Sequence, residues 1–284
     1  MVGLRMDTLQ TTTPAILHHL HFTSADPGRL SRFYARLLEL SSSRAEDGTY
    51  VLGGGQRRLL VSKGERCAAA FIAFAVQDVA ALEKLRGKLA ETVGDLEAAR
   101  SPLFSEGSFA IRDPQGRCIV FGVAPAKGYQ DPRPGRLQHV VFQTTVIDPL
   151  VEFYVNKVGF AVSDKVLNED GSLAAFFLRS DKEHHSLAFF VGAKNELDHH
   201  AYETTCWNDI RDWGDRFGKE KISMFWGPGR HGPGNNLFFM VRDADGNKLE
   251  LSAELETFTP EQTPRIWPNT EYTLNYWGSA WMRS

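Results

Sequence analysis

The feature that most constrains the fold of this chain is an internal repeat. Residues 16–40 align with residues 137–160 when their Phe-Tyr pairs are matched, and this alignment places His19 on His139. In both stretches an alternating or apolar segment is followed by an Asp-Pro turn and then by apolar residues at helical spacing. Each stretch therefore predicts a strand followed by a helix.

A second pair of stretches repeats at the other end of each half. Residues 109–124 align with residues 238–254, and each contains an apolar strand, an R-D-x-x-G turn and another strand. In such a turn glycine accepts a positive φ, and the aspartate binds the turn's own backbone. Between these ends, residues 68–85 align with residues 199–217, again as a strand followed by a helix. Each half is thus predicted to hold two strand–helix–strands units.

The segment 124–137 contains Pro, Gly and charged residues, as expected for an exposed linker. We therefore expect an N-terminal domain over 1–125, a second domain over 126–256 and a tail over 257–284. The tail has no counterpart in the first half. Its prolines and three tryptophans predict an extended strap that packs on the body or over the mouth of a cavity.

Composition narrows the functional classes. The net charge of −3 and the interspersed charges give no reason to expect a nucleic-acid or anionic-membrane partner, which leaves small neutral or weakly charged ligands. No apolar run approaches the length of about 20 residues that spans a bilayer. The three cysteines lie far apart and form no C-x-x-C pair. We therefore expect a cytoplasmic protein in a reducing compartment.

The differences between the halves indicate where chemistry could occur. Three residues of the second half fall on alanine or valine in the first: His199 on Ala68, His200 on Ala69, and Glu250 on Val120. Neighbouring residues of a strand point to opposite faces, so at most one histidine of the pair can face a given site. A site formed by His139, one of these histidines and Glu250 would therefore exist in the second half only.

Two imidazoles and one carboxylate on one face of a metal form the triad typical of non-haem Fe(II) oxygenases, and Mn²⁺ also fits such a site. The alternative interpretation is structural. Glu250 would then be a solvent-facing strand residue between Leu249 and Leu251, and the histidines would be incidental.

The sequence around these residues resembles the vicinal oxygen chelate superfamily, and within it the type I extradiol ring-cleaving dioxygenases, the catechol 2,3-dioxygenase and homoprotocatechuate 2,3-dioxygenase group. The resemblance covers both repeats and is strongest in "LQHVVF", "HSLAFF", "LDHHAYET" and "GPGRHGPGNNLFFMVRDADGNKLELSAE". It implies an α+β fold of two tandem domains, each made of paired βαβββ modules. It also implies a metal-free N-terminal domain, one iron in the C-terminal domain, and a homo-oligomer.

Carried over residue by residue, the resemblance implies a metal bound by His139, His199 and Glu250, with His200 as the alternative to His199. His185 falls on the family's acid–base histidine. Its alternative interpretation is a strand-end surface residue beside His184. His231, in the loop "GPGRHGPG", matches a histidine that lies in the second coordination sphere of the metal in relatives, and its alternative interpretation is a turn residue. The implied reaction has both oxygens of an aromatic diol bind Fe(II), with O₂ as co-substrate, and opens the ring to a semialdehyde-type product.

Four positions depart from the family pattern. Met240 stands where relatives have a tyrosine and Val141 where they have an asparagine, while Trp226 and Leu274 replace arginines of the members that act on carboxylated catechols. These changes predict an apolar pocket and a catechol with an alkyl or aryl substituent. They also leave open another reaction with Fe²⁺ or Mn²⁺ at the same site, or an aromatic-ligand binding protein without catalysis.

Overall fold

The computed structural model describes residues 11, 13–54, 56–65, 68–125, 135–259 and 262–282. Most of the predicted linker over 124–137, and also Cys67, lie outside these ranges. Cys118 and Cys206 form no disulfide. Within the described ranges, no helix has the length and apolar character needed to cross a membrane.

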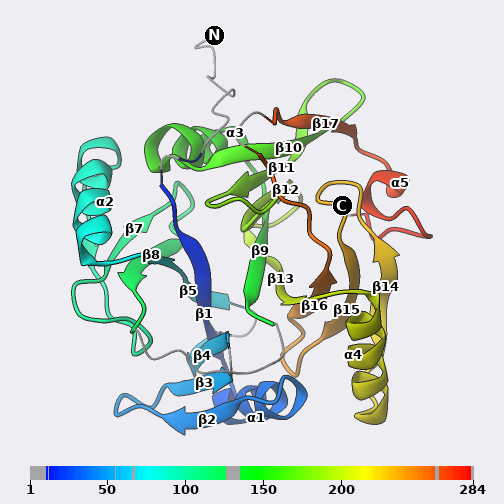
Figure 1. Ribbon diagram of the computed structural model, residues 1–284, viewed down its shortest axis with the longest axis horizontal. Helices are drawn as coiled ribbons and strands as arrows, with labels where there is room; N and C mark the ends of the chain where they lie inside the picture. The colour runs from blue at the N-terminus through cyan, green and yellow to red at the C-terminus, as the bar shows by residue number, and fades with distance from the viewer. Residues whose placement is uncertain are drawn as a thin grey trace.

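The predicted α+β fold is confirmed: two mixed β-sheets are accompanied by few helices (Figure 1). The first sheet has the strand order β2-β3-β4-β1-β5-β8-β7-β6. Its elements are β1 (Ile16–Ser24), α1 (Pro27–Leu37), β2 (Ser41–Arg44), β3 (Tyr50–Gly54), β4 (Arg57–Lys63), β5 (Ala68–Val76), α2 (Val79–Thr92), β6 (Glu97–Ala98), β7 (Phe109–Arg112) and β8 (Cys118–Val123). They form two βαβββ modules that meet through antiparallel β1 and β5.

The second sheet repeats this arrangement, with the order β14-β15-β16-β13-β9-β12-β11-β10-β17. Its elements are β9 (Leu137–Thr144), α3 (Asp148–Val151), the π-helix η1 (Glu152–Val158), β10 (Ala161–Leu167), β11 (Leu173–Arg179), β12 (Leu187–Val191), β13 (Glu196–Thr204), α4 (Trp207–Lys219), β14 (Met224–Arg230), β15 (Leu237–Arg242), β16 (Lys248–Ala253), β17 (Arg265–Pro268) and α5 (Glu271–Leu274). The two modules meet through antiparallel β9 and β13. The tail adds β17 in parallel to β10, at the edge of the sheet.

The repeated R-D-x-x-G turns have the predicted chemistry. Gly116 and Gly246 adopt φ values of 79° and 99°, in the region that favours glycine. Asp113 accepts hydrogen bonds from the backbone of its own turn, and Asp243 does the same in the second half. Each aspartate therefore satisfies backbone donors that would otherwise be buried without a partner.

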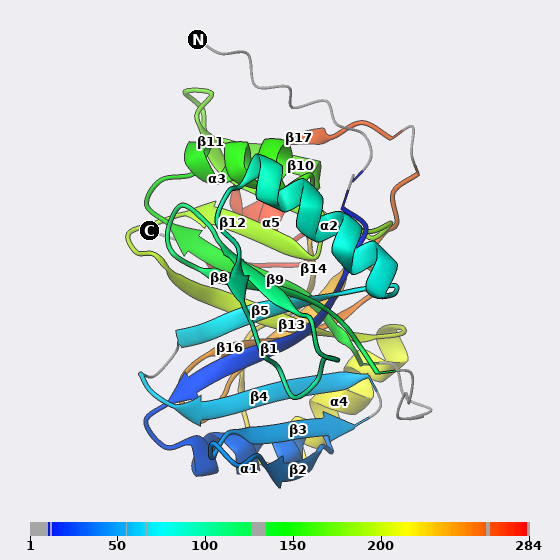
Figure 2. The same ribbon diagram turned by 90° about the vertical axis from the view of Figure 1, so that its left-hand side faces the viewer.

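The two repeated motifs also join the halves to each other. Tyr34 of α1 donates a hydrogen bond to Asp243 of the second half, over 2.7 Å, and Tyr154 of η1 donates one to Asp113 of the first half, over 3.1 Å. Strand β1 contacts β9, and β5 contacts β13. Figure 2 shows these four strands crossing the centre of the molecule. A single hydrophobic core contains buried residues of both halves.

Candidate active site

Three central strands of the second sheet place ligand-type side chains on one face. Ala201 of β13 pairs with His139 of β9 on one side and with Glu250 of β16 on the other. Residues paired in this way point to the same face of a sheet, and so does His199, two positions before Ala201. The small side chain of Ala201 leaves room between the three.

The same register in the first sheet corrects part of the sequence alignment. Ala73 pairs with His19 and with Val120, so Ala73 is the counterpart of Ala201. The alignment of residues 68–85 with 199–217 is therefore wrong by three positions, and His199 and His200 correspond to Phe71 and Ile72, not to Ala68 and Ala69. The match of Glu250 to Val120 is confirmed. A phenyl ring and an isopropyl group cannot bind a metal, so the first half lacks two of the three ligand positions.

The three donor atoms lie within reach of one ion. Nε2 of His199 is 3.3 Å from Oε2 of Glu250, and Nε2 of His139 is 3.7 Å from the same oxygen. Both distances are below about 4.2 Å, the largest separation of two ligand atoms that each lie about 2.1 Å from one cation. All three donor atoms lie within 4.8 Å of one another. Two imidazoles and a carboxylate are also a donor set that suits Fe(II) or Mn(II). The residues present therefore fit such a metal.

All three side chains are buried, and burial keeps the imidazoles neutral. Desolvation lowers the pKa of His139 to about 3. It also lowers the pKa of His199, although the neighbouring Asp198 acts in the opposite direction. Metal binding requires a neutral imidazole, so neither ring has to lose a proton first at neutral pH.

Two further side chains contact the candidate ligands. Oδ1 of Asp198 accepts a hydrogen bond from Nδ1–H of His199 over 2.5 Å, which leaves the Nε2 lone pair directed toward Glu250. Asn236 donates from Nδ2 to Oε1 of Glu250 over 3.1 Å. Sequence reasoning missed both residues. An acidic residue directly before a candidate ligand was the available signal for Asp198.

The second histidine of the pair lies on the opposite face of β13. His200 is buried, and its Nε2 is 3.1 Å from the hydroxyl of Tyr34, between the halves. It has no place in the group of donor atoms that includes His199. The geometry therefore favours His199 over His200 as the ligand.

A small cavity opens over these residues. Besides His139 and His199 it is lined by Val141, Phe177, His185, Phe190, Trp226, His231, Pro233 and Leu274. Val141, Trp226 and Leu274 thus lie at the cavity. Met240 does not line it and is buried among Trp226, Phe238 and Leu274. Sequence reasoning missed Phe177, Phe190 and Pro233.

Two more histidines approach the candidate metal ligands. The ring of His185 lies 4.3 Å from that of His139, and burial lowers the pKa of His185 well below its usual value. His185 and His184 are both buried, so the alternative of a surface residue is wrong.

His231 donates from Nδ1–H to the carbonyl oxygen of Leu274 over 2.6 Å, and burial lowers its pKa to about 4. Its Nε2 is 4.0 Å from Oε2 of Glu250.

The C-terminal tail packs on this side of the second half. Leu274 of α5 lines the cavity, and the carbonyl oxygen of Ser279 accepts a hydrogen bond from the indole of Trp226 over 3.0 Å. The Trp226 indole is therefore already engaged by the tail. Its N–H group therefore does not replace the hydroxyl donor that is absent because Met240 stands at the position of the expected tyrosine.

Comparison with known proteins finds similar sequences and a matching family model. Residues 136–251 match the model of the Glyoxalase/Bleomycin resistance protein/Dioxygenase superfamily. Metapyrocatechase 2 of Cupriavidus necator is 28% identical over 149 residues, which are 51% of this chain and 45% of that protein. The 3-methylcatechol 2,3-dioxygenase of Pseudomonas putida is 25% identical over 268 residues, with coverage of 85% and 88%. Several relatives, metapyrocatechase 2 included, are matched over about half of their own length.

Two solved structures share the fold of the whole chain. Homoprotocatechuate 2,3-dioxygenase from Arthrobacter globiformis has a TM-score of 0.81 at 21% identity and covers 98% of this chain and 92% of its own. The Mn(II)-bound glyoxalase from Novosphingobium aromaticivorans has a TM-score of 0.80 at 22% identity, with coverage of 94% and 91%. Residues 136–251 therefore resemble a domain of the glyoxalase/bleomycin resistance protein/dioxygenase superfamily, and the whole chain shares the fold of these two solved structures.

Proposed function

We propose that this protein is an extradiol dioxygenase that cleaves the ring of a catechol with an alkyl or aryl substituent, using O₂ and a divalent metal, Fe(II) or Mn(II). The observation that carries the proposal is the convergence of His139, His199 and Glu250 at an apolar cavity that two further histidines also line. A metal bound there would hold the two diol oxygens and supply the redox chemistry that O₂ requires.

The protein's own groups would handle protons and orientation. Nδ1–H of His231 is bonded to the Leu274 carbonyl, so its Nε2 carries a lone pair that can accept a hydrogen bond from a bound ligand. His185 lies against His139 and is placed to accept a proton from a diol hydroxyl. The aromatic rings of Phe177 and Phe190 and the side chain of Leu274 would exclude water and hold the ring by packing.

The walls of the cavity favour an apolar substituent. Among the described residues that line it, none is lysine or arginine. A buried carboxylate on the substrate would therefore lack a cationic partner and be strongly disfavoured. The relative named 3-methylcatechol 2,3-dioxygenase supports the same choice, because a methyl group is an apolar substituent.

A second candidate is a reaction on another oxygen-chelating substrate that does not consume O₂. It is favoured by the fold shared with a Mn(II)-bound glyoxalase and by Met240, which stands where extradiol relatives have tyrosine. A protein that only binds aromatic ligands is a weaker alternative, because ligand storage needs neither the three ligand-type residues nor His185.

The deciding experiment combines metal analysis with anaerobic binding of substituted catechols, followed by admission of oxygen. We expect one O₂ consumed per substrate and a coloured product. Substrate conversion without oxygen would support the second candidate, and binding without conversion would support the third. We also expect a higher kcat/KM for a methyl-substituted catechol than for its carboxylated analogue, and equal values would contradict the substituent preference.

Two variants of neighbouring residues provide a matched control. His199→Gln should lose bound metal and activity. His200→Gln keeps a polar group for Tyr34 on the opposite face and should retain both. The reverse result would assign the metal to His200.

A further inference from the structure

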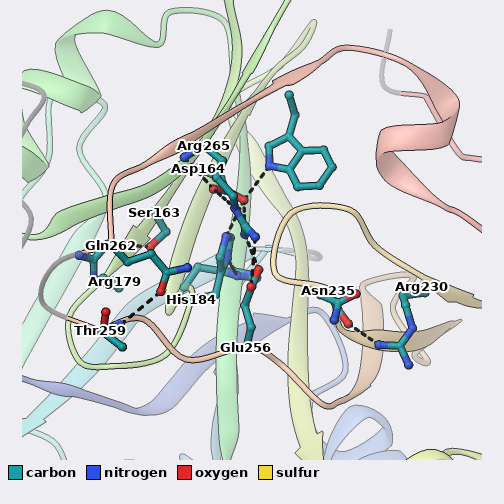
Figure 3. A network of polar contacts seen from close by, with 12 residues as sticks. Ser163, Asp164, Arg179, His184, Arg230, Asn235, Glu256, Thr259, Gln262 and Arg265 are labelled. Carbon is teal, nitrogen blue, oxygen red and sulfur yellow. Dashed lines mark hydrogen bonds and ion pairs between the residues drawn. The ribbon is translucent and has the colours of Figure 1, made fainter.

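A polar network connects the C-terminal tail to His184 (Figure 3), and His184 in turn contacts His185. Its centre is Asp164 of β10, which is fully buried. Arg265 of β17 donates from Nε to Oδ1 over 2.9 Å and from Nη2 to Oδ2 over 2.8 Å, and the Trp267 indole also donates to Oδ2 over 2.8 Å. Nε2 of His184 lies 2.9 Å from the same oxygen.

The parallel pairing of β17 with β10 explains how the tail reaches Asp164. The register places Arg265 opposite Asp164, and Trp267 is two positions further along β17, where side chains point to the same face. A tail that lacked this alternation could not direct both donors to one carboxylate.

This network contains a second group of potential ligands, Asp164, His184 and Glu256, whose donor atoms lie close enough for one metal ion. However, the guanidinium of Arg265 bonds to both carboxylates. A positive charge already lies between them, so a second cation would have to displace it. We therefore consider a role other than metal binding for this group, one that depends on the contact of His184 with His185.

For the neutral forms of His184 and His185, the hydrogen bonds indicate which ring nitrogens carry protons. Burial alone would raise the pKa of Asp164, but hydrogen bonds from His184 and Arg265 outweigh it and lower that pKa. An ionised carboxylate only accepts, so His184 must donate from Nε2–H. With its proton on Nε2, a neutral His184 has a lone pair on Nδ1. That atom is 2.8 Å from Nδ1 of His185, which must then be the donor.

We propose that Asp164 and His184 are positioning residues that fix His185 as the Nδ1–H tautomer, so that its Nε2 presents a lone pair to the cavity. Within the proposed function, on which its catalytic meaning rests, this prepares His185 to accept a proton from the substrate rather than to donate one. Nδ1 of His231 is held by Leu274, so both rings would meet the ligand with an acceptor nitrogen.

The tautomer can be measured without any catalysis. In metal-free protein labelled with ¹⁵N-histidine, two-bond ¹H–¹⁵N correlation spectra distinguish the two neutral tautomers of each ring, and His185→Gln assigns the signals of His185. We expect Nδ1–H with an aprotic Nε2 at His185, and Nε2–H at His184. A wild-type spectrum with Nε2–H at His185, or a doubly protonated His184, would overturn the proposal before any further variant is made.

Two substitutions of His184 then test the cause. His184→Phe removes the acceptor, and we expect His185 to shift toward the Nε2–H form. His184→Asn keeps an amide oxygen near the position of Nδ1 and should preserve the Nδ1–H tautomer. An unchanged tautomer in His184→Phe, with folding verified by circular dichroism, would overturn the assignment.

Kinetics separate this proposal from the proposed function. For the metal-loaded enzyme we expect kcat to fall at least about 10-fold in His184→Phe. Metal content and anaerobic catechol affinity should be unchanged, and His184→Asn should recover most of kcat. Unchanged kcat in His184→Phe would overturn the positioning role. If the wild type cleaves no catechol, the proposed function fails, whereas the tautomer measurement still stands.

Discussion

At the residue scale, the orientation of His199 depends on Asp198. Asp198→Ala removes the acceptor of the 2.5 Å hydrogen bond and lets the imidazole rotate or change tautomer. We expect the affinity for Mn²⁺ to fall about 10- to 100-fold, because partners of this kind orient a ligand and raise its basicity. Calorimetric titration of metal-free protein would measure the change. Asp212→Ala, on the exposed surface of α4, serves as the control and should bind Mn²⁺ like the wild type.

Residue types that carry chemistry were predictable from the sequence, whereas their supporting contacts were not. His199 and Glu250 were identified as differences between the repeats, whereas His139 has a counterpart in His19. The structure brings the donor atoms of all three together. The contact of Asn236 with Glu250 depends on how a loop folds back on β16, which no local pattern encodes. No local pattern predicts the position of Phe177 either. It reaches the cavity from β11, in the module of the second half that begins with β9.

At the scale of elements, the site depends on a small residue in the middle strand. Ala201 is paired with His139 and Glu250, and its side chain points to their face. Ala201→Leu would place a branched side chain between the ligands. We expect loss of measurable Mn²⁺ binding with a circular dichroism spectrum like that of the wild type. Ala201→Ser, which adds one atom, should retain binding, and full metal binding by Ala201→Leu would contradict this account of the site.

The four modules were predictable because their motifs recur with similar spacing, but one register was not. Strand β5 is an uninterrupted apolar run, so sliding it by three residues changes little in the pattern. The helices that follow β5 and β13 begin after capping residues of different types, Asp78 and Cys206. The sequence therefore did not indicate the correct alignment of the two strands. Only the pairing of Ala73 and Ala201 with their neighbours fixes it. Likewise, prolines in the tail indicated an extended strap but not that β17 would pair with β10.

At the scale of the whole molecule, stability should depend on pH through buried neutral histidines. Desolvation, with a further contribution from Arg58, lowers the pKa of His18 from 6.5 to about 3. Between these values the unfolded chain binds a proton at this site and the native protein does not, so acidification from pH 6.5 toward 3 lowers the free energy of unfolding.

Replacement of His18 should reduce this dependence. In metal-free protein, we expect His18→Gln to lower the slope of unfolding free energy against pH by about 1.2 kcal/mol per pH unit between pH 6 and 5. Urea titrations at several pH values measure that slope. A slope equal to that of the wild type would show that His18 is protonated in the folded protein.

The two tyrosine bonds between the halves should contribute to the stability of the whole chain. Tyr34→Phe removes the donor to Asp243, and Tyr154→Phe removes the donor to Asp113. Because each carboxylate stays buried, we expect each variant to lose about 1–2 kcal/mol of unfolding free energy. The exposed Tyr272 provides the control, and Tyr272→Phe should unfold like the wild type.

The double variant tests whether these bonds act on a single transition. The two tyrosines lie in different helices and have no common partner, so their effects should add within about 0.5 kcal/mol. Both bonds cross between the halves and one hydrophobic core spans them, so urea should unfold the double variant in one step at a lower midpoint. Two separate transitions in the wild type would mean that the halves are stable independently. In that case the bonds from Tyr34 and Tyr154 orient the halves but do not couple their folding.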